Sequence, residues 1–128
     1  MFALNAKDRY HLRALKRLAE LREGKLKLFA TDTAILEFQV VLRSVDRKSE
    51  AVRNALLALR SALQMNGAIE IATIDTELLA RQCEIEQEYG LSYFDSLIAA
   101  SALRLNDGIL SDDESFDIVP SIARRALS

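Results

Sequence analysis

The amino-acid sequence predicts an α/β domain built on a parallel sheet. Short apolar strand patterns over residues 25–30, 68–73 and 109–110 alternate with longer stretches of helical periodicity, and this order is typical of parallel strands joined by helices. A second observation is the complete αβ unit within residues 91–113. Half of the 128 residues are apolar, which suits one compact domain over residues 1–128 and leaves no room for a second of ordinary size.

This αβ unit carries its own start and stop signals. Ser92 is a good N-cap, and Asp95 three residues later completes an S-x-x-D capping box. Small and apolar residues at helical spacing continue until Gly108, which ends the helix before the short apolar strand at residues 109–110. In open α/β sheets, ligands bind at the carboxyl ends of the strands. Three polar residues stand at the carboxyl end of this strand: Ser111, Asp112 and Asp113.

The remaining elements follow from the same kinds of signal. Helices are expected over residues 8–23, from Thr31 or Asp32 to about 42, over about 50–65 and from Asp75 or Thr76 to Gly90, with a last strand over 116–119. Cys83 falls on the apolar face predicted for the fourth of these helices, so we expect a buried structural thiol. A single cysteine excludes an intrachain disulfide and fits a reducing compartment.

Composition narrows the classes of partner. With 17 basic and 19 acidic residues the formal charge is −2, so no global positive field favours nucleic acid, and any basic footprint must be local. The longest apolar runs are too short to span a bilayer, and the amino terminus lacks the apolar core of a signal peptide. These observations predict a cytoplasmic protein with no membrane contact.

Glu37 is a further acid of interest, because it lies within an otherwise apolar helical stretch. Leu36 and Phe38 flank it, and Val41 lies one turn away. A carboxylate on a core-facing stripe is costly unless it is paired or binds a metal ion. A simpler interpretation is that the helix phase differs by one residue and that Glu37 is exposed. Simpler interpretations also exist for Asp95, as a helix cap alone, and for Asp112 and Asp113, as a solvated turn.

Two segments carry a family resemblance. SYFDSLIAASAL followed by ILSDD resembles the carboxyl-terminal half of PIN domains, the metal-dependent ribonuclease fold that includes the VapC toxins, and TDTAILEFQVVL resembles the family's passage from second strand to helix. The resemblance implies a three-layer α/β/α sandwich around a parallel sheet. It also implies that Glu37, Asp95 and Asp113 are the metal-binding and catalytic acids, with Ser111 and Asp112 in supporting positions.

Such a group of acids suits phosphodiester hydrolysis. Carboxylate oxygens select Mg²⁺ or Mn²⁺, and the chain has no His or Cys group with zinc spacing. A bound ion lowers the pKa of its water and neutralises charge on the leaving oxygen. The expected substrate is single-stranded RNA, with Arg43, Arg47 and Lys48 as candidate phosphate contacts. By resemblance the protein is the toxin of a type II toxin–antitoxin pair, with an antitoxin partner, and forms a homodimer.

The amino-terminal sequence departs from the family pattern. MFALNAKDRYHLRALKRLAEL resembles the passage from the end of the first strand into the first helix, so the family's central first strand and its Asp are expected to be missing or truncated. This leaves a second interpretation open, a catalytically impaired PIN-like protein that works as an RNA- or protein-binding or dimerisation module. A third is an unrelated small α/β domain in which the acids are only caps and turns.

Overall fold

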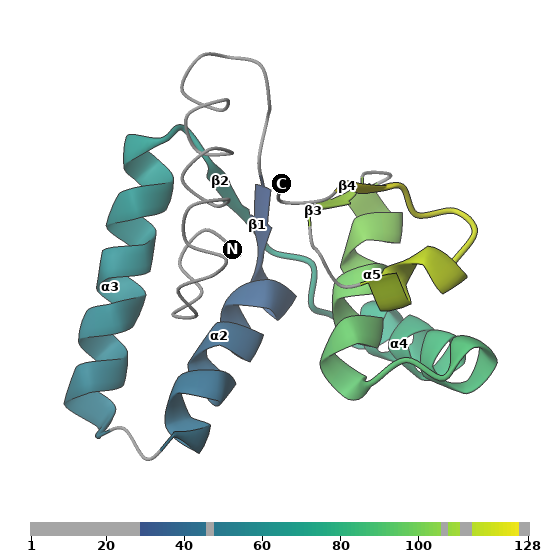
Figure 1. Ribbon diagram of the computed structural model, residues 1–128, viewed down its shortest axis with the longest axis horizontal. Helices are drawn as coiled ribbons and strands as arrows, with labels where there is room; N and C mark the ends of the chain where they lie inside the picture. Colours follow the sequence, from purple (N-terminus) through teal and green to yellow (C-terminus); the bar gives the residue numbers. More distant parts are fainter. Residues whose placement is uncertain (1–28, 46–47, 106–107, 111–113, 126–128) are drawn as a thin grey trace. The chain divides into compact units, whose positions relative to one another are not determined.

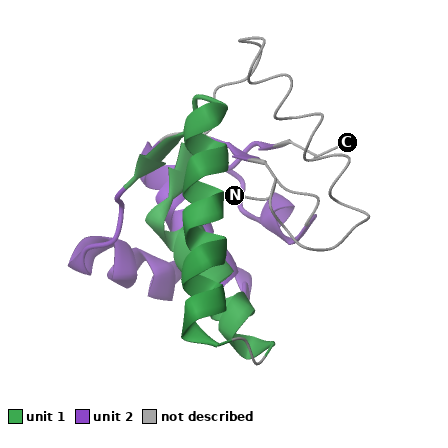
Figure 2. Ribbon diagram, turned by 90° about the vertical axis from the view of Figure 1, so that its left-hand side faces the viewer, with its two compact units in different colours: residues 1–71 green, residues 72–128 purple. Residues whose placement is uncertain are grey.

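The computed structural model describes residues 29–45, 48–105, 108–110 and 114–125 (Figure 1). The chain divides into two compact units, Met1–Ile71 (unit 1) and Ala72–Ser128 (unit 2), which Figure 2 colours separately. Each unit combines helices with a pair of parallel strands, as the predicted α/β class requires. The helix expected over residues 8–23 and the expected loss of the first strand lie outside the described residues.

Unit 1 places two helices between two parallel strands. Strand β1 (Phe29–Thr31) leads into helix α2 (Asp32–Ser44), which is followed by helix α3 (Ser49–Met65) and strand β2 (Ile69–Ile71). The strands pair in register, from Phe29 opposite Ile69 to Thr31 opposite Ile71. The carboxyl end of β1 is therefore also the start of α2.

The two helices in the described part of unit 1 begin and end close to where the sequence signals predict. Thr31 caps α2, and its side chain accepts a hydrogen bond from the Ala34 N–H at 3.3 Å. Helix α3 ends at Asn66 and is followed by Gly67, whose φ of 72° suits a residue without a Cβ atom. The buried residues of α3 lie on one face of the helix: Val52, Leu59 and Leu63.

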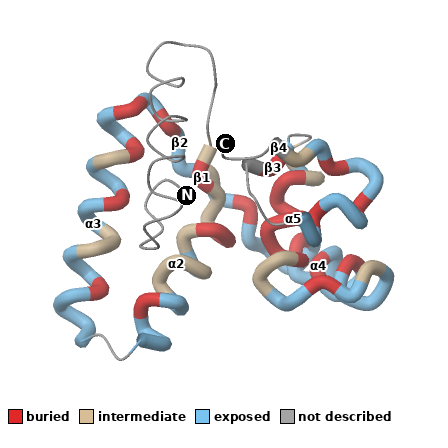
Figure 3. The backbone as a smooth tube through the Cα atoms, in the orientation of Figure 1, coloured by how far each residue is buried: buried red, intermediate tan, exposed pale blue. Residues whose placement is uncertain are grey.

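Unit 2 is organised around a helix that is buried on nearly all sides. Helix α4 (Thr76–Tyr89) packs on helix α5 (Tyr93–Leu105), and the short parallel strands β3 (Ile109–Leu110) and β4 (Arg124–Arg125) follow. Every residue of α5 from Ser96 to Ala102 is buried, as the burial colours of Figure 3 show. Such a helix must be apolar or small-chained on every face. The run of alanines and serines predicted from the sequence meets this need.

Helix α4 has the predicted ends but a different buried face. The Asp75 side chain accepts a hydrogen bond from the Leu78 N–H at 2.8 Å, and Gly90 ends the helix with a φ of 69°. The buried positions are Leu78, Gln82 and Ile85. Cys83 lies about 100° further round the helix than Gln82 and is exposed, so the prediction of a buried thiol was wrong.

The prediction of a strand over residues 116–119 was also wrong. Residues Glu114–Ile118 form a 3₁₀ helix, η2, and the last strand, β4, lies further on, at Arg124–Arg125. The buried residues here are Phe116, Val119 and Ile122, three apart, whereas Ile118 is exposed. A spacing of three matches a 3₁₀ turn, in which side chains at i and i+3 lie on one face.

Gly108 lies where β3 and β4 approach closely. A Cβ atom at this position would stand 2.5 Å from the carbonyl oxygen of Ala123, and the same oxygen accepts a hydrogen bond from the Ile109 N–H at 2.9 Å. Only glycine allows this approach without a shift of backbone.

Taken together, the described strands form two parallel pairs, β1 with β2 and β3 with β4. The α/β class and the parallel orientation agree with the prediction, whereas the three-layer arrangement and the single domain over residues 1–128 stay predictions. None of the helices within the described ranges combines the length and the apolar character that a membrane crossing requires.

Candidate active site

Asp95 stands at the start of the buried helix of unit 2. It occupies the first turn of α5 and is half-buried, whereas the next residue, Ser96, is fully buried. The Asp95 backbone N–H donates to the Ser92 hydroxyl at 3.3 Å, as the predicted cap requires. The carboxylate is therefore attached to an ordered helix turn at the border between solvent and core.

A buried polar contact from α4 reaches the same turn. Ser96 Oγ donates to the carbonyl oxygen of Tyr93 at 2.8 Å, and Gln82 Nε2 donates to Ser96 Oγ at 2.9 Å. Gln82 Nε2 also donates to Glu86 Oε2 at 2.6 Å. The site residues predicted from the sequence did not include Gln82, although a polar residue on an otherwise apolar helix face is the signal that could have identified it.

Glu37 lies in unit 1, on the second turn of α2. It is half-buried, so it lies between the two positions considered from the sequence, one facing the core and one exposed to solvent. Thr33, Ala34 and Leu42 form the buried face of α2, while Leu36 is exposed. Glu37 therefore lies between the buried and the exposed face of α2, the helix that follows the carboxyl end of β1.

The remaining acids of the predicted site cannot be placed beside these two. Ser111, Asp112 and Asp113 follow β3 directly in the sequence but lie outside the described residues. Glu37 and Asp95 belong to different units. Within the described part of the chain, no group of three His, Cys, Asp or Glu residues could hold a metal ion, so the convergence of Glu37, Asp95 and Asp113 stays a prediction.

Comparison with known protein families decides the family. The family model of the PIN domain matches residues 1–121, a range that includes the helices bearing Glu37 and Asp95 and the strands β1, β2 and β3. This chain belongs to the PIN domain family. PIN domains are generally nucleases and typically use divalent metal ions. No curated protein matches the chain.

The acids of this PIN domain fit a divalent cation in their chemistry. Glu37 and Asp95 each offer carboxylate oxygens, which are the ligands that Mg²⁺ and Mn²⁺ prefer. Each of the two is half-buried, at the border between solvent and the packed interior. Together with Asp113, these residues would hold the ion.

The basic residues predicted to contact RNA lie around the connection between α2 and α3. Arg43 is exposed in the last turn of α2, and Lys48 is exposed at the N-cap position of α3. Arg47, between them, lies outside the described residues. A cation in the last turn of a helix also interacts favourably with the helix dipole, so the position of Arg43 has a structural explanation as well.

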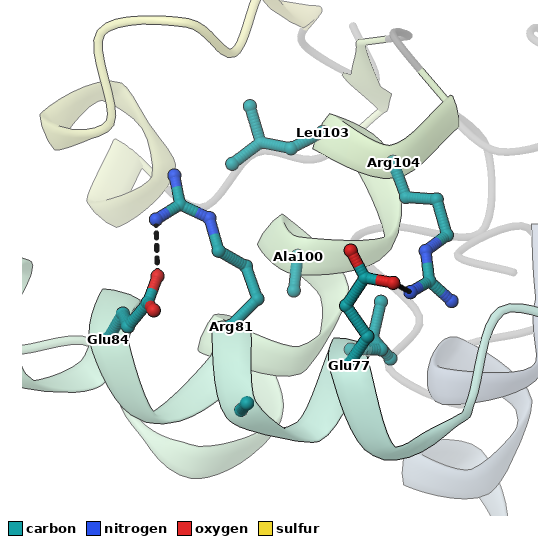
Figure 4. Close-up of a pocket in the computed structure, with 8 residues that line it drawn as sticks. Glu77, Arg81, Glu84, Ala100, Leu103 and Arg104 are labelled. Carbon is teal, nitrogen blue, oxygen red and sulfur yellow. Dashed lines mark hydrogen bonds and ion pairs between the residues drawn. The ribbon is translucent and has the colours of Figure 1, made fainter.

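A shallow groove of about 450 Å³ runs between α4 and α5 in unit 2 (Figure 4). Its charged walls are paired. Arg81 contacts Glu84 at 2.8 Å, and Arg104 lies 3.8 Å from Glu77. Figure 4 shows the Arg81 side chain extending from α4 toward Glu84, while the Arg104 side chain descends from α5. The groove therefore presents alternating charges without a dominant sign.

Arg104 also anchors the end of α5 to the segment before α4. Its guanidinium donates to the carbonyl oxygen of Thr73 at 2.5 Å and to Asp75 Oδ1 at 2.8 Å. The hydrogen bond from Arg104, followed by that from the Leu78 N–H, holds the pKa of Asp75 below its usual value. The sequence predicted Asp75 as a cap but gave no local signal for Arg104, because the two residues are 29 positions apart.

Proposed function

We propose that this PIN domain is a Mg²⁺- or Mn²⁺-dependent endoribonuclease that cleaves single-stranded RNA. The observation that carries the proposal is the position of Asp95, half-buried in the first turn of a helix that is otherwise buried on nearly all sides. Membership of a family of nucleases gives this position its chemical meaning. Asp95, Glu37 and Asp113 are proposed to share the ion, with Ser111 and Asp112 in support.

Each part of the proposed site has a defined task. A divalent ion held by these residues would supply an activated water at neutral pH and would neutralise negative charge on the scissile phosphate. Asp95 and Glu37 hold their carboxylates ready on helices whose N-termini are capped, so little side-chain and backbone freedom is lost when an ion binds. Because a water acts as nucleophile, no side chain of the protein needs to form a covalent bond to the substrate.

RNA contact is proposed at the basic residues near the α2–α3 connection. Arg43 and Lys48 are exposed there and can neutralise backbone phosphates, with Arg47 as the third cation of the cluster. Single strands are favoured because their backbone can bend toward a recessed ion. We further propose a homodimer, an antitoxin protein as partner and a cytoplasmic location for this toxin-like protein.

Two measurements test the function on the whole chain. Mn²⁺ should raise the melting temperature of the wild-type protein, and the protein should then cleave a fluorescently labelled single-stranded RNA. Asp95→Asn should abolish both effects, since it removes one ligand charge while the backbone hydrogen bond to Ser92 persists. Asp75→Asn is the matched control, because asparagine still caps α4 and the residue lies outside the proposed site.

The outcomes separate the three interpretations of the sequence. Stabilisation by Mn²⁺ without cleavage would favour a PIN domain that binds RNA or protein without catalysis. Neither stabilisation nor cleavage would mean that the acids serve as caps and turns. Cleavage that survives in Asp95→Asn would remove this residue from the site.

A further inference from the structure

We infer that Gln82 is a positioning residue for Asp95. Through its hydrogen bond to Ser96, Gln82 holds the first turn of α5 and so fixes the geometry in which the Asp95 carboxylate meets the metal ion. This inference rests on the proposed metal-dependent function and extends it to a residue on a neighbouring helix.

The donors and acceptors around Ser96 admit one orientation of the Gln82 amide. The single hydroxyl hydrogen of Ser96 goes to the carbonyl oxygen of Tyr93, so Ser96 Oγ must accept from Gln82. The two hydrogens of Gln82 Nε2 are then used on Ser96 and on Glu86. The amide oxygen faces Cys83, whose Sγ lies 3.5 Å away. Rotating the amide by 180° would present an oxygen where two donors are needed.

Burial makes this contact consequential. Gln82 is 3% exposed and Ser96 is fully buried, so an unpaired amide or hydroxyl would lose its hydrogen bond without gaining one from water. Position 82 lies between Leu78 and Ile85 on the buried face of α4, where an apolar side chain would satisfy packing alone. The presence of an amide at position 82 is therefore best explained by its hydrogen bond to Ser96.

The contact is adjacent to the proposed metal ligand. Ser96 follows Asp95 directly, and its hydroxyl binds the Tyr93 carbonyl in the same helix turn. A change in the Gln82 contact is thus transmitted to Asp95 through a single turn of backbone. Residues that hydrogen-bond directly to metal ligands commonly change metal affinity by about 10- to 100-fold when they are replaced, so the indirect contact of Gln82 should act at the lower end of that range.

The same helix supplies a matched control. Thr73 and Ser101 form a second buried hydroxyl contact, at 2.8 Å, five residues further along α5 than Ser96. Thr73→Val removes a buried hydrogen bond of the same kind from α5 but lies away from the turn that carries Asp95. If a less stable α5 were enough to weaken Mn²⁺ binding, Thr73→Val would weaken it as well. If Gln82 positions Asp95, only the loss of the Gln82 contact should weaken Mn²⁺ binding.

The test is a double-mutant cycle on metal affinity. Gln82→Met, Ser96→Ala and the double variant are titrated with Mn²⁺. The Mn²⁺ midpoint is recorded in two ways: as the apparent dissociation constant fitted to the dependence of the melting temperature on Mn²⁺ concentration, and as the concentration that gives half of maximal RNA cleavage. Each single variant should raise this midpoint by about tenfold. The double variant should raise it no further, because both changes remove the same contact. Thr73→Val should lower the melting temperature of the metal-free protein but leave the Mn²⁺ midpoint within about twofold of the wild type.

Several results would overturn the inference. A Gln82→Met protein that melts at a lower temperature but keeps the wild-type Mn²⁺ midpoint would give Gln82 a structural role only, as would additive effects in the double variant. If Gln82→Met fails to fold, Ser96→Ala, which removes the same contact with a smaller change in volume, decides alone. Absence of any Mn²⁺ response in the wild-type protein would instead reject the proposed function itself, and the inference with it.

Discussion

The hydroxyl groups of Thr73 and Ser101 lie 2.8 Å apart in the interior of unit 2. Ser101 donates its hydrogen to the carbonyl oxygen of Leu97 at 3.1 Å, so Thr73 is the donor to Ser101. This contact ties the segment that precedes α4 to the middle of α5. It joins two residues that the sequence analysis had not connected.

Thr73→Val should lower the free energy of unfolding by about 1 kcal/mol, because it removes a buried hydrogen bond while nearly preserving side-chain shape. Urea denaturation of the metal-free protein measures this. Thr76→Val is the control, since Thr76 is exposed at the start of α4 and its replacement should change stability by less than about 0.5 kcal/mol. Equal stability of the two variants would show that the buried contact contributes little.

Arg104→Gln should weaken the dependence of stability on acid pH. Asp75 has a lower pKa in the folded chain, chiefly because Arg104 donates a hydrogen bond to it. Its contribution is therefore complete above the unfolded pKa of about 3.9 and is lost as the pH falls through the lower folded value. In Arg104→Gln, the free energies of unfolding measured at pH 5 and at pH 3 should differ less than they do in the wild type.

Two features of unit 2 frame this experiment. Arg124 lowers the pKa of Asp117 in the same way, so the Arg104→Gln protein keeps part of its acid sensitivity. Arg81→Gln removes an exposed arginine that pairs with Glu84 on the same helix, and it should leave the pH dependence unchanged. An identical acid response in Arg104→Gln and the wild type would contradict the assignment.

Gly108→Ala should destabilise the protein by about 1–3 kcal/mol, the usual cost of forcing an extra carbon atom into a closed space. The new Cβ atom would stand 2.5 Å from the Ala123 carbonyl oxygen and would push apart the two backbone segments at the start of β3 and β4. Gly67→Asn provides the contrast. Gly67 has a φ of 72° but open space around its Cβ position, and asparagine tolerates this conformation. If urea denaturation shows Gly67→Asn to be less stable than Gly108→Ala, this explanation is contradicted.

Glu37→Gln should raise the Mn²⁺ concentration needed for half-maximal stabilisation by about tenfold or more, because one ligand charge is lost. The metal-free protein should melt near the wild-type temperature, since glutamine has almost the same shape. Glu50→Gln, at an exposed site in the first turn of α3, serves as control. A wild-type Mn²⁺ midpoint in Glu37→Gln would make Glu37 an ordinary residue of the helix edge.

The helices could be predicted because their signals are local. Caps at Thr31 and Asp75, a glycine at position 90 and regular apolar spacing act within one or two turns, so they can be identified in the sequence itself. Asp95 shows a local pattern of the same kind, its capping relation to Ser92, whereas its assignment to the site came from the family resemblance and stays a prediction. These predictions needed no knowledge of which elements pack together.

The errors arose where packing between distant segments decides the outcome. Cys83 was predicted to lie on the apolar face of its helix, yet the face of α4 that contacts α5 is that of Gln82. The buried residues around Phe116 are spaced by three, and over so short a segment their apolar pattern could not be distinguished from that of a strand. The contacts of Gln82 and Arg104 join residues 14 to 31 positions apart, so no local pattern could indicate which residues they contact.

The uninterrupted burial of α5 has a consequence for how unit 2 opens. A helix enclosed from Ser96 to Ala102 can expose its amides to deuterium only when neighbouring elements separate, so these amides should exchange among the slowest in the unit. The turn that bears Asp95 continues directly into this protected segment. The proposed ligand thus stays in place through the frequent small openings of the surface and loses its position only in rare, large ones.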